Sequence, residues 1–118
     1  MQKLIFIVDD NDSNLTLLSS IIENKYNVLT MSTAQKMFSL LAKKKPHLIF
    51  LDIEMPEIGG FDALAKLREN DEWADIPVVL VTGWYTEEIK QRAVDMGAVT
   101  VIAKPFSAQH ILDVVAIC

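Results

Sequence analysis

The chain has 118 residues, about the size of one domain, and its content of 51% hydrophobic and 23% charged residues is typical of a globular protein. Its formal net charge of −5 argues against a general nucleic-acid-binding surface, which requires clustered Lys and Arg. No apolar run approaches the roughly 20 residues that span a bilayer, and the single cysteine, Cys118, excludes a disulfide within one chain. We therefore expect one soluble, cytoplasmic domain over 1–118, either free-standing or cut from a longer protein with an output domain.

Short apolar runs alternate with helical stretches along the chain, which is the pattern of a parallel sheet with helices on both faces. Asp12 or Ser13 is expected to cap the first helix, and Gly97 to end the fourth. Right-handed crossovers between five such units favour an α/β, doubly wound sheet with strand order 2-1-3-4-5. The expected strands cover 4–8, 27–30, 48–51, 78–81 and 99–103, and the expected helices cover 13–22, 33–44, 61–69, 86–96 and 107–117.

The last expected helix carries more apolar surface than packing on a sheet requires. One stripe runs along it, and Val114 and Ile117 lie off that stripe. Because exposed apolar surface often marks a contact site, we expect either an interface on this helix or a chain cut from a longer protein. The stripe consists of Ala108, Ile111, Leu112, Val115 and Cys118.

Polar residues stand at the downstream ends of four of the expected strands. Asp9 and Asp10 follow the first strand, Asp52 follows the third, Thr82 follows the fourth and Lys104 follows the fifth. In an open α/β sheet the carboxyl ends of the strands lie along one edge, where ligands bind. The order 2-1-3-4-5 makes the first and third strands neighbours, so the three carboxylates should lie side by side.

This set of residues indicates a divalent metal and a phosphoryl group. Mg²⁺ takes one or a few carboxylates and fills its remaining positions with water. Asp52 can hold that metal and also act as a nucleophile that forms an acyl phosphate. Lys104 and the metal would offset charge on the phosphoryl oxygens, and the Thr82 hydroxyl can donate a hydrogen bond to one of them.

Each of these residues also has an ordinary structural explanation. A lone Asp at a strand end usually caps a helix or turn, which is the interpretation we favour for Asp12. Thr82 could simply end its strand, and Lys104 could be a solvated residue ahead of a turn. Their occurrence together, in order, at four strand ends argues against coincidence.

Five segments resemble the motifs of the receiver domain of two-component response regulators, the CheY-like family, and the likeness covers nearly all of the chain. The resemblance implies a flavodoxin-like (βα)5 sandwich and a signalling domain whose only reaction is its own phosphorylation and dephosphorylation, not an enzyme with a diffusing substrate. The segments are Val-Asp-Asp at 8–10, Leu-Asp-Ile-Glu-Met-Pro at 51–56, Gly60, Val-Thr-Gly at 81–83 and Lys-Pro-Phe at 104–106.

The resemblance also implies roles for the acidic residues. Asp52 would be the phosphoacceptor, which takes its phosphoryl group from the phosphohistidine of a sensor histidine kinase or a phosphotransfer protein. Asp10 resembles the direct Mg²⁺ ligand, and Asp9 resembles its partner that acts mostly through water. The main-chain carbonyl of Glu54 would complete the protein ligands.

For the other side of the site, the resemblance implies a switch. Thr82 resembles the hydroxyl that moves in to bind the phosphoryl group, and Lys104 resembles the lysine that pairs with it, followed by a cis bond to Pro105. The family usually has an aromatic residue or His three positions before this lysine, where this chain has Val101. Either Trp84 or the adjacent Tyr85 moves in its place, or both only pack the loop.

Two further side chains lie next to the expected site. Glu54 stands two residues after the acceptor, and Trp84 stands two residues after the threonine. Both are expected to line the path by which water would attack the acyl phosphate, and we expect slow phosphate loss.

Two rival functions and several partners follow from these observations. One rival is a pseudo-receiver, a protein-interaction module that no longer cycles phosphate. Val101 favours it, whereas the presence of Asp10, Asp52, Thr82 and Lys104 argues against it. The other is a small Mg²⁺-dependent phosphatase, which would need a second acid and a covering cap.

Receiver domains of this kind often dimerise or contact output domains through the fourth helix, fifth strand and fifth helix. We expect no direct nucleic-acid or membrane binding by this domain.

Overall fold

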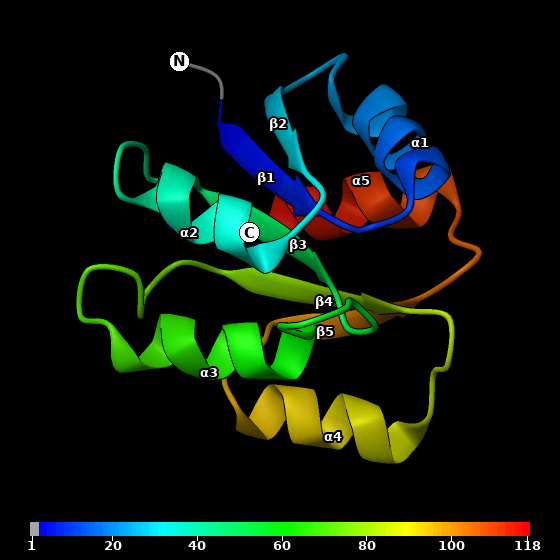
Figure 1. Cartoon of the computed structure of the whole chain (residues 1–118). Helices are drawn as coiled ribbons and strands as arrows, with labels where there is room; N and C mark the ends of the chain where they lie inside the picture. The colour runs from blue at the N-terminus through cyan, green and yellow to red at the C-terminus, as the bar shows by residue number, and fades with distance from the viewer. Residues whose placement is uncertain (1–2) are drawn as a thin grey trace.

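The structure is a computed structural model, and it describes residues 3–118 as strands and helices in strict alternation (Figure 1). The longest described helix has 11 residues, and none of the helices in the described part is long and apolar enough to cross a membrane. The elements are β1 (Leu4–Val8), α1 (Asp12–Ile22), β2 (Asn27–Met31), α2 (Ala34–Leu41), β3 (Leu48–Asp52), α3 (Gly60–Glu69), β4 (Val78–Thr82), α4 (Glu87–Asp95), β5 (Thr100–Ala103) and α5 (Ala108–Ile117).

The strands form one parallel sheet in the order β2-β1-β3-β4-β5, which confirms the predicted order. The register aligns the strand ends: Val8 of β1 lies opposite Leu51 of β3, and Thr82 of β4 lies opposite Ala103 of β5. The carboxyl ends of β1, β3, β4 and β5 therefore meet along one edge of the sheet.

Helices cover both faces of the sheet, with α1 and α5 on one face and α2, α3 and α4 on the other (Figure 1). Successive side chains of a strand point to opposite faces, so β3 contributes Ile49 to one core and Phe50 to the other. Leu64 of α3 packs into the first core and Ile111 of α5 into the second. Each such side chain contributes roughly 1.5–3 kcal/mol on burial, and together they hold the strand ends in register.

The predicted cap of the first helix was wrong. Asn11 is the N-cap, and its side chain accepts a hydrogen bond from the backbone N–H of Asn14 at 3.0 Å. Asn11 is held in an extended conformation because its own N–H donates to Oδ1 of Asp9 at 2.9 Å. Asp12 is therefore the first helical residue, where its negative charge interacts favourably with the positive end of the helix dipole.

The second helix is shorter than predicted and ends at Leu41 instead of residue 44. The backbone N–H groups of Lys43 and Lys44 both donate to the carbonyl of Leu40, which closes a turn. Residues 42–45 are exposed, and the three that follow Ala42 are lysines, whereas Pro46 is buried and leads into β3. The helix therefore ends at Leu41, the last of its side chains that packs into the core.

The apolar surface of α5 was also partly misassigned. Val114 is buried with Ile111 and Val115, so it belongs to the face that packs on the sheet. Ala108 is exposed, although it was placed on the apolar stripe. Ile117 is 78% exposed and lies off the core as predicted.

Glycines allow two sharp changes of direction. Gly97 has φ +97° directly after α4, as predicted for a residue that ends this helix. Gly60 begins α3 so close to the end of β3 that a Cβ there would lie 2.6 Å from the carbonyl oxygen of Asp52. This close approach fixes the loop that follows the expected phosphoacceptor.

Candidate functional site

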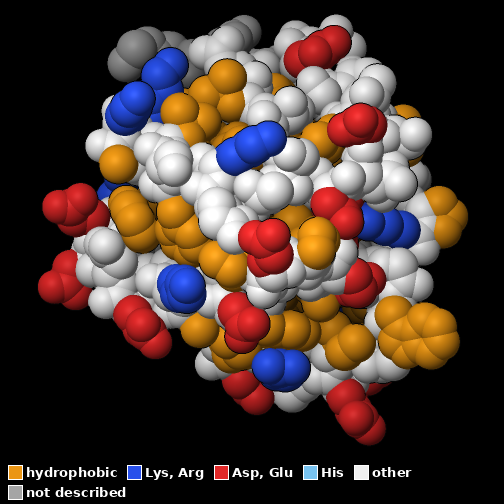
Figure 2. Space-filling view, viewed as in Figure 1, with side chains coloured by type: hydrophobic (Ala, Val, Ile, Leu, Met, Phe, Trp, Pro, Cys, Tyr) orange, Lys and Arg blue, Asp and Glu red, His pale blue; other side chains and the backbone are white. Residues whose placement is uncertain are grey.

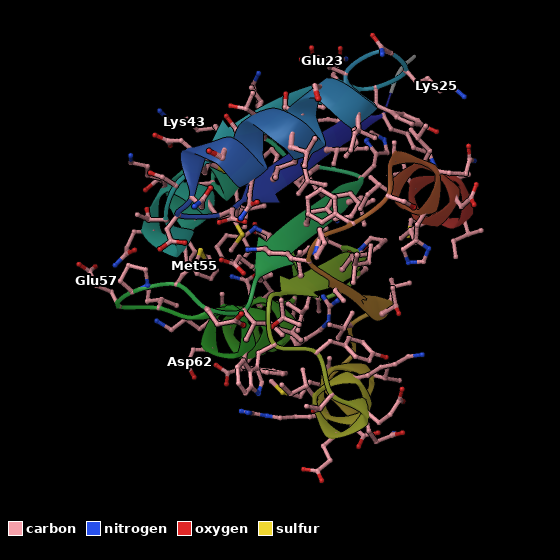
Figure 3. The ribbon with its side chains drawn as sticks, turned by 90° about the vertical axis from the view of Figure 1, so that its right-hand side faces the viewer. Glu23, Lys25, Lys43, Met55, Glu57 and Asp62 are labelled. Atoms are coloured by element: carbon pink, nitrogen blue, oxygen red, sulfur yellow. The ribbon has the colours of Figure 1, made fainter. Side chains whose placement is uncertain are left out.

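The four predicted polar positions lie together at the carboxyl edge of the sheet. Asp9 directly follows β1, Asp52 ends β3, Thr82 ends β4 and Lys104 directly follows β5. Figure 3 turns this edge toward the viewer and shows the loop with Met55 and Glu57 extending outward beside it. Asp9, Asp52 and Thr82 are buried, an arrangement that polar groups adopt only when partners compensate for lost water.

Lys104 links the first and third strands through its side chain. Its ammonium nitrogen lies 3.1 Å from Oδ2 of Asp9 and 3.2 Å from Oδ1 of Asp52. Its backbone N–H donates to the carbonyl of Thr82 at 2.8 Å, and the bond to Pro105 is cis, as the resemblance implied. One lysine therefore contacts both buried carboxylates while its backbone extends the ladder between β4 and β5.

The electrostatics of the site favour a proton on Asp52. Burial raises the pKa of Asp52 to about 7, the negative charge of Asp9 adds to this rise, and the ammonium of Lys104 opposes it. Burial alone would lower the pKa of Lys104, but the hydrogen bonding and attraction of Asp9 and Asp52 outweigh it and raise that pKa. A further cation at this site would therefore favour the ionised form of Asp52.

The carboxylates fit a hard divalent cation. One oxygen each from Asp9, Asp10 and Asp52 lie within 4.8 Å of one another, and Asp10 is exposed to solvent. Oδ2 of Asp9 is buried, and its contact among the described residues is the 3.1 Å ion pair with Lys104. Carboxylate oxygens with access to water are the donors that Mg²⁺ prefers.

The contact between the Glu54 side chain and Thr82 was not predicted from the sequence. The Thr82 hydroxyl oxygen lies 2.8 Å from both carboxylate oxygens of Glu54, so its single proton is shared between them. The backbone N–H of Gly83 donates to Oε1 of Glu54 at 3.1 Å. The Thr82 oxygen in turn accepts a hydrogen bond from the backbone N–H of Trp84 at 2.9 Å.

This contact could be foreseen only in part. The spacing of Glu54 from Asp52 placed its side chain beside the site, but its partner Thr82 lies 28 positions further along the chain. The local sequence contains no signal that a loop carboxylate turns toward the next strand. Its direction depends on how the β3–α3 loop packs above β4.

Val101 occupies the position three residues before Lys104 where an aromatic residue or His is usual in the family. Val101 is buried in β5, beside a surface groove of about 540 Å³ that Tyr85, Lys90 and His110 line. Trp84 is 75% exposed and Tyr85 is 36% exposed, and the expectation that one of them moves stays a prediction.

His47 lies at the opposite edge of the sheet, where its Nδ1 accepts the backbone N–H of Leu4 at 3.0 Å. This contact joins the start of β1 to the residue that precedes β3. His47 thus has a structural contact away from the candidate site.

Comparison with known proteins agrees with this geometry. The sequence model of the family described as the response regulator receiver domain matches residues 5–116. The polar-differentiation response regulator DivK of Brucella anthropi is 29% identical over 116 residues, which are 98% of this chain and 94% of DivK. A probable cyclic di-GMP phosphodiesterase of Vibrio cholerae is 31% identical over 90% of this chain, but over only 24% of its own length. The solved structure of the Vibrio cholerae chemotaxis protein CheY4 has a TM-score of 0.91 at 23% identity, with 98% of each chain covered, which shows the shared fold.

Proposed function

The chain belongs to the response regulator receiver domain family, and on that basis we propose that it accepts a phosphoryl group on Asp52 with Mg²⁺ bound beside it. Receiver domains are signalling domains, so the reaction changes this protein itself. The donor is the phosphohistidine of a sensor histidine kinase or a phosphotransfer protein. The proposed setting is the cytoplasm, whose reducing conditions suit a chain with one cysteine, Cys118.

The observation that carries the proposal is the convergence of Asp9, Asp52 and Lys104 within 3.1–3.2 Å contacts at the sheet edge. In the transfer, an Asp52 oxygen forms a bond to phosphorus as the phosphorus–nitrogen bond of the donor breaks, and the imidazole leaves with a proton from solvent. Lys104 would offset charge on the phosphoryl oxygens as they approach Asp52, a role that its contact with the Asp52 carboxylate supports.

Mg²⁺ would be held by Asp9, Asp10, Asp52 and the main-chain carbonyl of Glu54, and it would supply positive charge that favours ionised Asp52 and neutralises the phosphoryl oxygens. The clustered carboxylate oxygens and the solvent exposure of Asp10 support this assignment. Asp9 is fixed by the N–H of Asn11, so its second oxygen keeps one direction toward the site.

The output of the switch would be read on the surface of α4, β5 and α5, by an output domain or a second copy of the chain. Exposed apolar residues on and beside these elements support this part of the proposal, namely Val94, Val99 and Ile117. Acidic and basic side chains are interspersed on the face seen in Figure 2, which therefore carries no continuous basic surface of the kind that nucleic acids need.

The experiment is phosphorylation with acetyl phosphate and Mg²⁺, followed by intact-mass measurement. We expect a gain of one phosphoryl group, which disappears when Asp52→Asn replaces the acceptor or when EDTA removes the metal. A gain that survives Asp52→Asn would place the acceptor elsewhere.

The alternative function is an interaction module that does not cycle phosphate. Val101, in place of the family's usual aromatic residue, is the observation that favours it. A folded protein that gains no mass with acetyl phosphate and binds no beryllofluoride would support this alternative and contradict the phosphoacceptor role.

A further inference from the structure

The side chain of Glu54 is a carboxylate at the site for which phosphoryl transfer has no evident use. It belongs to the exposed β3–α3 loop, yet it turns back onto the end of β4. There it accepts hydrogen bonds from two donors at once, the Thr82 hydroxyl and the Gly83 backbone N–H. Hydrogen bonds to a charged acceptor are the stronger kind, so this contact fixes both donors.

The same two donors face the place where a phosphoryl group on Asp52 would need them. Asp52 and Thr82 end neighbouring strands, and Asp52 lies opposite Val81 in the register. A phosphoryl oxygen is an anionic acceptor, as a carboxylate oxygen is, and it would compete for the same hydroxyl proton and amide. The two anions cannot share these donors without strong repulsion.

We propose that the Glu54 carboxylate is a built-in competitor of the phosphoryl group, which holds Thr82 and Gly83 until the phosphoryl group displaces it. This inference rests on the proposed function. Glu54 is able to leave because it is exposed and its long side chain can turn into solvent. The energy needed to displace it lowers the affinity of the site for any phosphoryl-like anion.

The displacement also reaches the surface beyond the site. The Thr82 oxygen that Glu54 holds also accepts the backbone N–H of Trp84, a residue of the exposed loop between β4 and α4. When Glu54 leaves, Thr82 can follow the new anion, and the hydrogen bond to Trp84 must adjust with it. Glu54 is therefore a positioning residue that sets how readily the switch moves.

The first test measures the binding of beryllofluoride with saturating Mg²⁺ to the wild-type chain and to Glu54→Ala and Glu54→Gln. We expect Glu54→Ala to bind about tenfold more tightly, since one charged acceptor has been removed from two donors. Glu54→Gln should lie between the two, because its neutral oxygen still accepts a hydrogen bond but more weakly. Mg²⁺ affinity is measured separately for each variant, so that a change in metal binding is not counted as release of the donors.

The matched control is Glu57→Gln, which removes the same charge from the same loop. Glu57 lies at the outer end of that loop, where it accepts a hydrogen bond from Gln35 at 2.6 Å (Figure 3). The affinity of the Glu57→Gln variant for beryllofluoride should equal that of the wild type. A gain as large as that of Glu54→Gln would show that only the net charge matters, and it would overturn the inference.

A second test needs no metal or anion. In the metal-free protein, Glu54→Ala should shift the amide resonance of Gly83 and speed its hydrogen exchange, whereas Glu57→Gln should change neither. An unchanged Gly83 amide in Glu54→Ala would overturn the inference. Binding of beryllofluoride by all variants with equal affinity would overturn it while the proposed function stands. A complete lack of binding in every variant would overturn both.

Discussion

The ammonium nitrogen of Lys104 lies 3.2 Å from Oδ1 of Asp52, although 52 positions separate the two residues in the chain. The contact crosses β4, which lies between β3 and β5 in the sheet. Asp52 is only 2% exposed, and Lys104 is the cation that contacts its buried carboxylate. The same ammonium also contacts the buried carboxylate of Asp9. Fold stability and the proposed chemistry therefore depend on the same charges.

Replacement of Asp52, the proposed acceptor, should stabilise the metal-free protein at neutral and higher pH. The pKa of Asp52 is about 7 in the folded protein, against an unfolded value near 3.9. Between these values the folded state keeps a proton that the unfolded state has lost, so this residue lowers stability as pH rises from about 4 to 7. At pH 8 in EDTA, Asp52→Asn should raise the free energy of unfolding by about 2–4 kcal/mol.

Urea denaturation of both proteins at pH 5 and pH 8 checks this expectation. The difference in unfolding free energy between Asp52→Asn and wild type should be larger at pH 8 than at pH 5. Equal differences at the two pH values would show that the Asp52 carboxyl titrates alike in the folded and unfolded states.

Removal of the lysine charge should tighten metal binding. The Lys104 ammonium contacts carboxylate oxygens of Asp9 and Asp52 that would also bind the metal, and its positive charge repels a divalent cation at the same site. We expect Lys104→Met to bind Mg²⁺ about tenfold more tightly by calorimetric titration, the factor that roughly 1.4 kcal/mol of lost repulsion would give. Weaker Mg²⁺ binding by the variant would contradict this account.

The control for this measurement is Lys45→Met. Lys45 forms an ion pair of 2.9 Å with Asp75, but both side chains are largely exposed, and such pairs contribute little. Its removal changes the net charge of the chain by the same amount as Lys104→Met. Magnesium affinity should therefore stay at the wild-type value.

Two glycines near the site should respond differently to alanine. A Cβ at Gly60 would lie 2.6 Å from the Asp52 carbonyl oxygen and 2.7 Å from the Cα of Ile53, and backbone atoms cannot move aside. A Cβ at Gly83 would meet only Oε1 of Glu54, at 4.0 Å. Gly60→Ala should lower the free energy of unfolding by about 3 kcal/mol, whereas Gly83→Ala should change it by less than about 0.5 kcal/mol. Similar denaturation midpoints for both variants would show that the β3–α3 loop yields to the added methyl group.

Tryptophan fluorescence should report the switch through one of two indoles. Trp84 is exposed and its backbone N–H binds the Thr82 hydroxyl oxygen, whereas Trp73 packs against Phe38 with ring centroids 5.6 Å apart. Beryllofluoride should therefore change the emission of the wild type and of Trp73→Phe, but not that of Trp84→Phe. No change in the wild-type emission would show that the loop after Thr82 stays in place.

The strand order and the joint position of the polar residues were predictable because they depend on a pattern that the chain repeats. Each strand is a short apolar run with a polar residue at its end, and right-handed connections leave few orders for five such units. Asp52 and Thr82 were placed by this rule alone, and the structure has them at the ends of β3 and β4.

The errors concern details that the chain decides through distant contacts. Asn11 became the helix cap because Asp9, itself fixed at the end of β1, binds its backbone N–H. Val114 was left off the core because the sequence spacing alone does not show that α5 buries a face wide enough to include it, packed with side chains of α1 and the sheet. The Glu54 side chain depends on Thr82, a partner on another strand.

The lysine that contacts Asp9 and Asp52 follows β5, so the site is complete only when the chain has been made and folded past residue 104. A growing chain that has folded only through β3 already contains Asp52 but not the lysine that contacts it. The proposed acceptor can therefore gain its full reactivity only after the last strand has joined the sheet. Phosphorylation would then report completed folding, and an unfinished chain would be a poor substrate for the kinase.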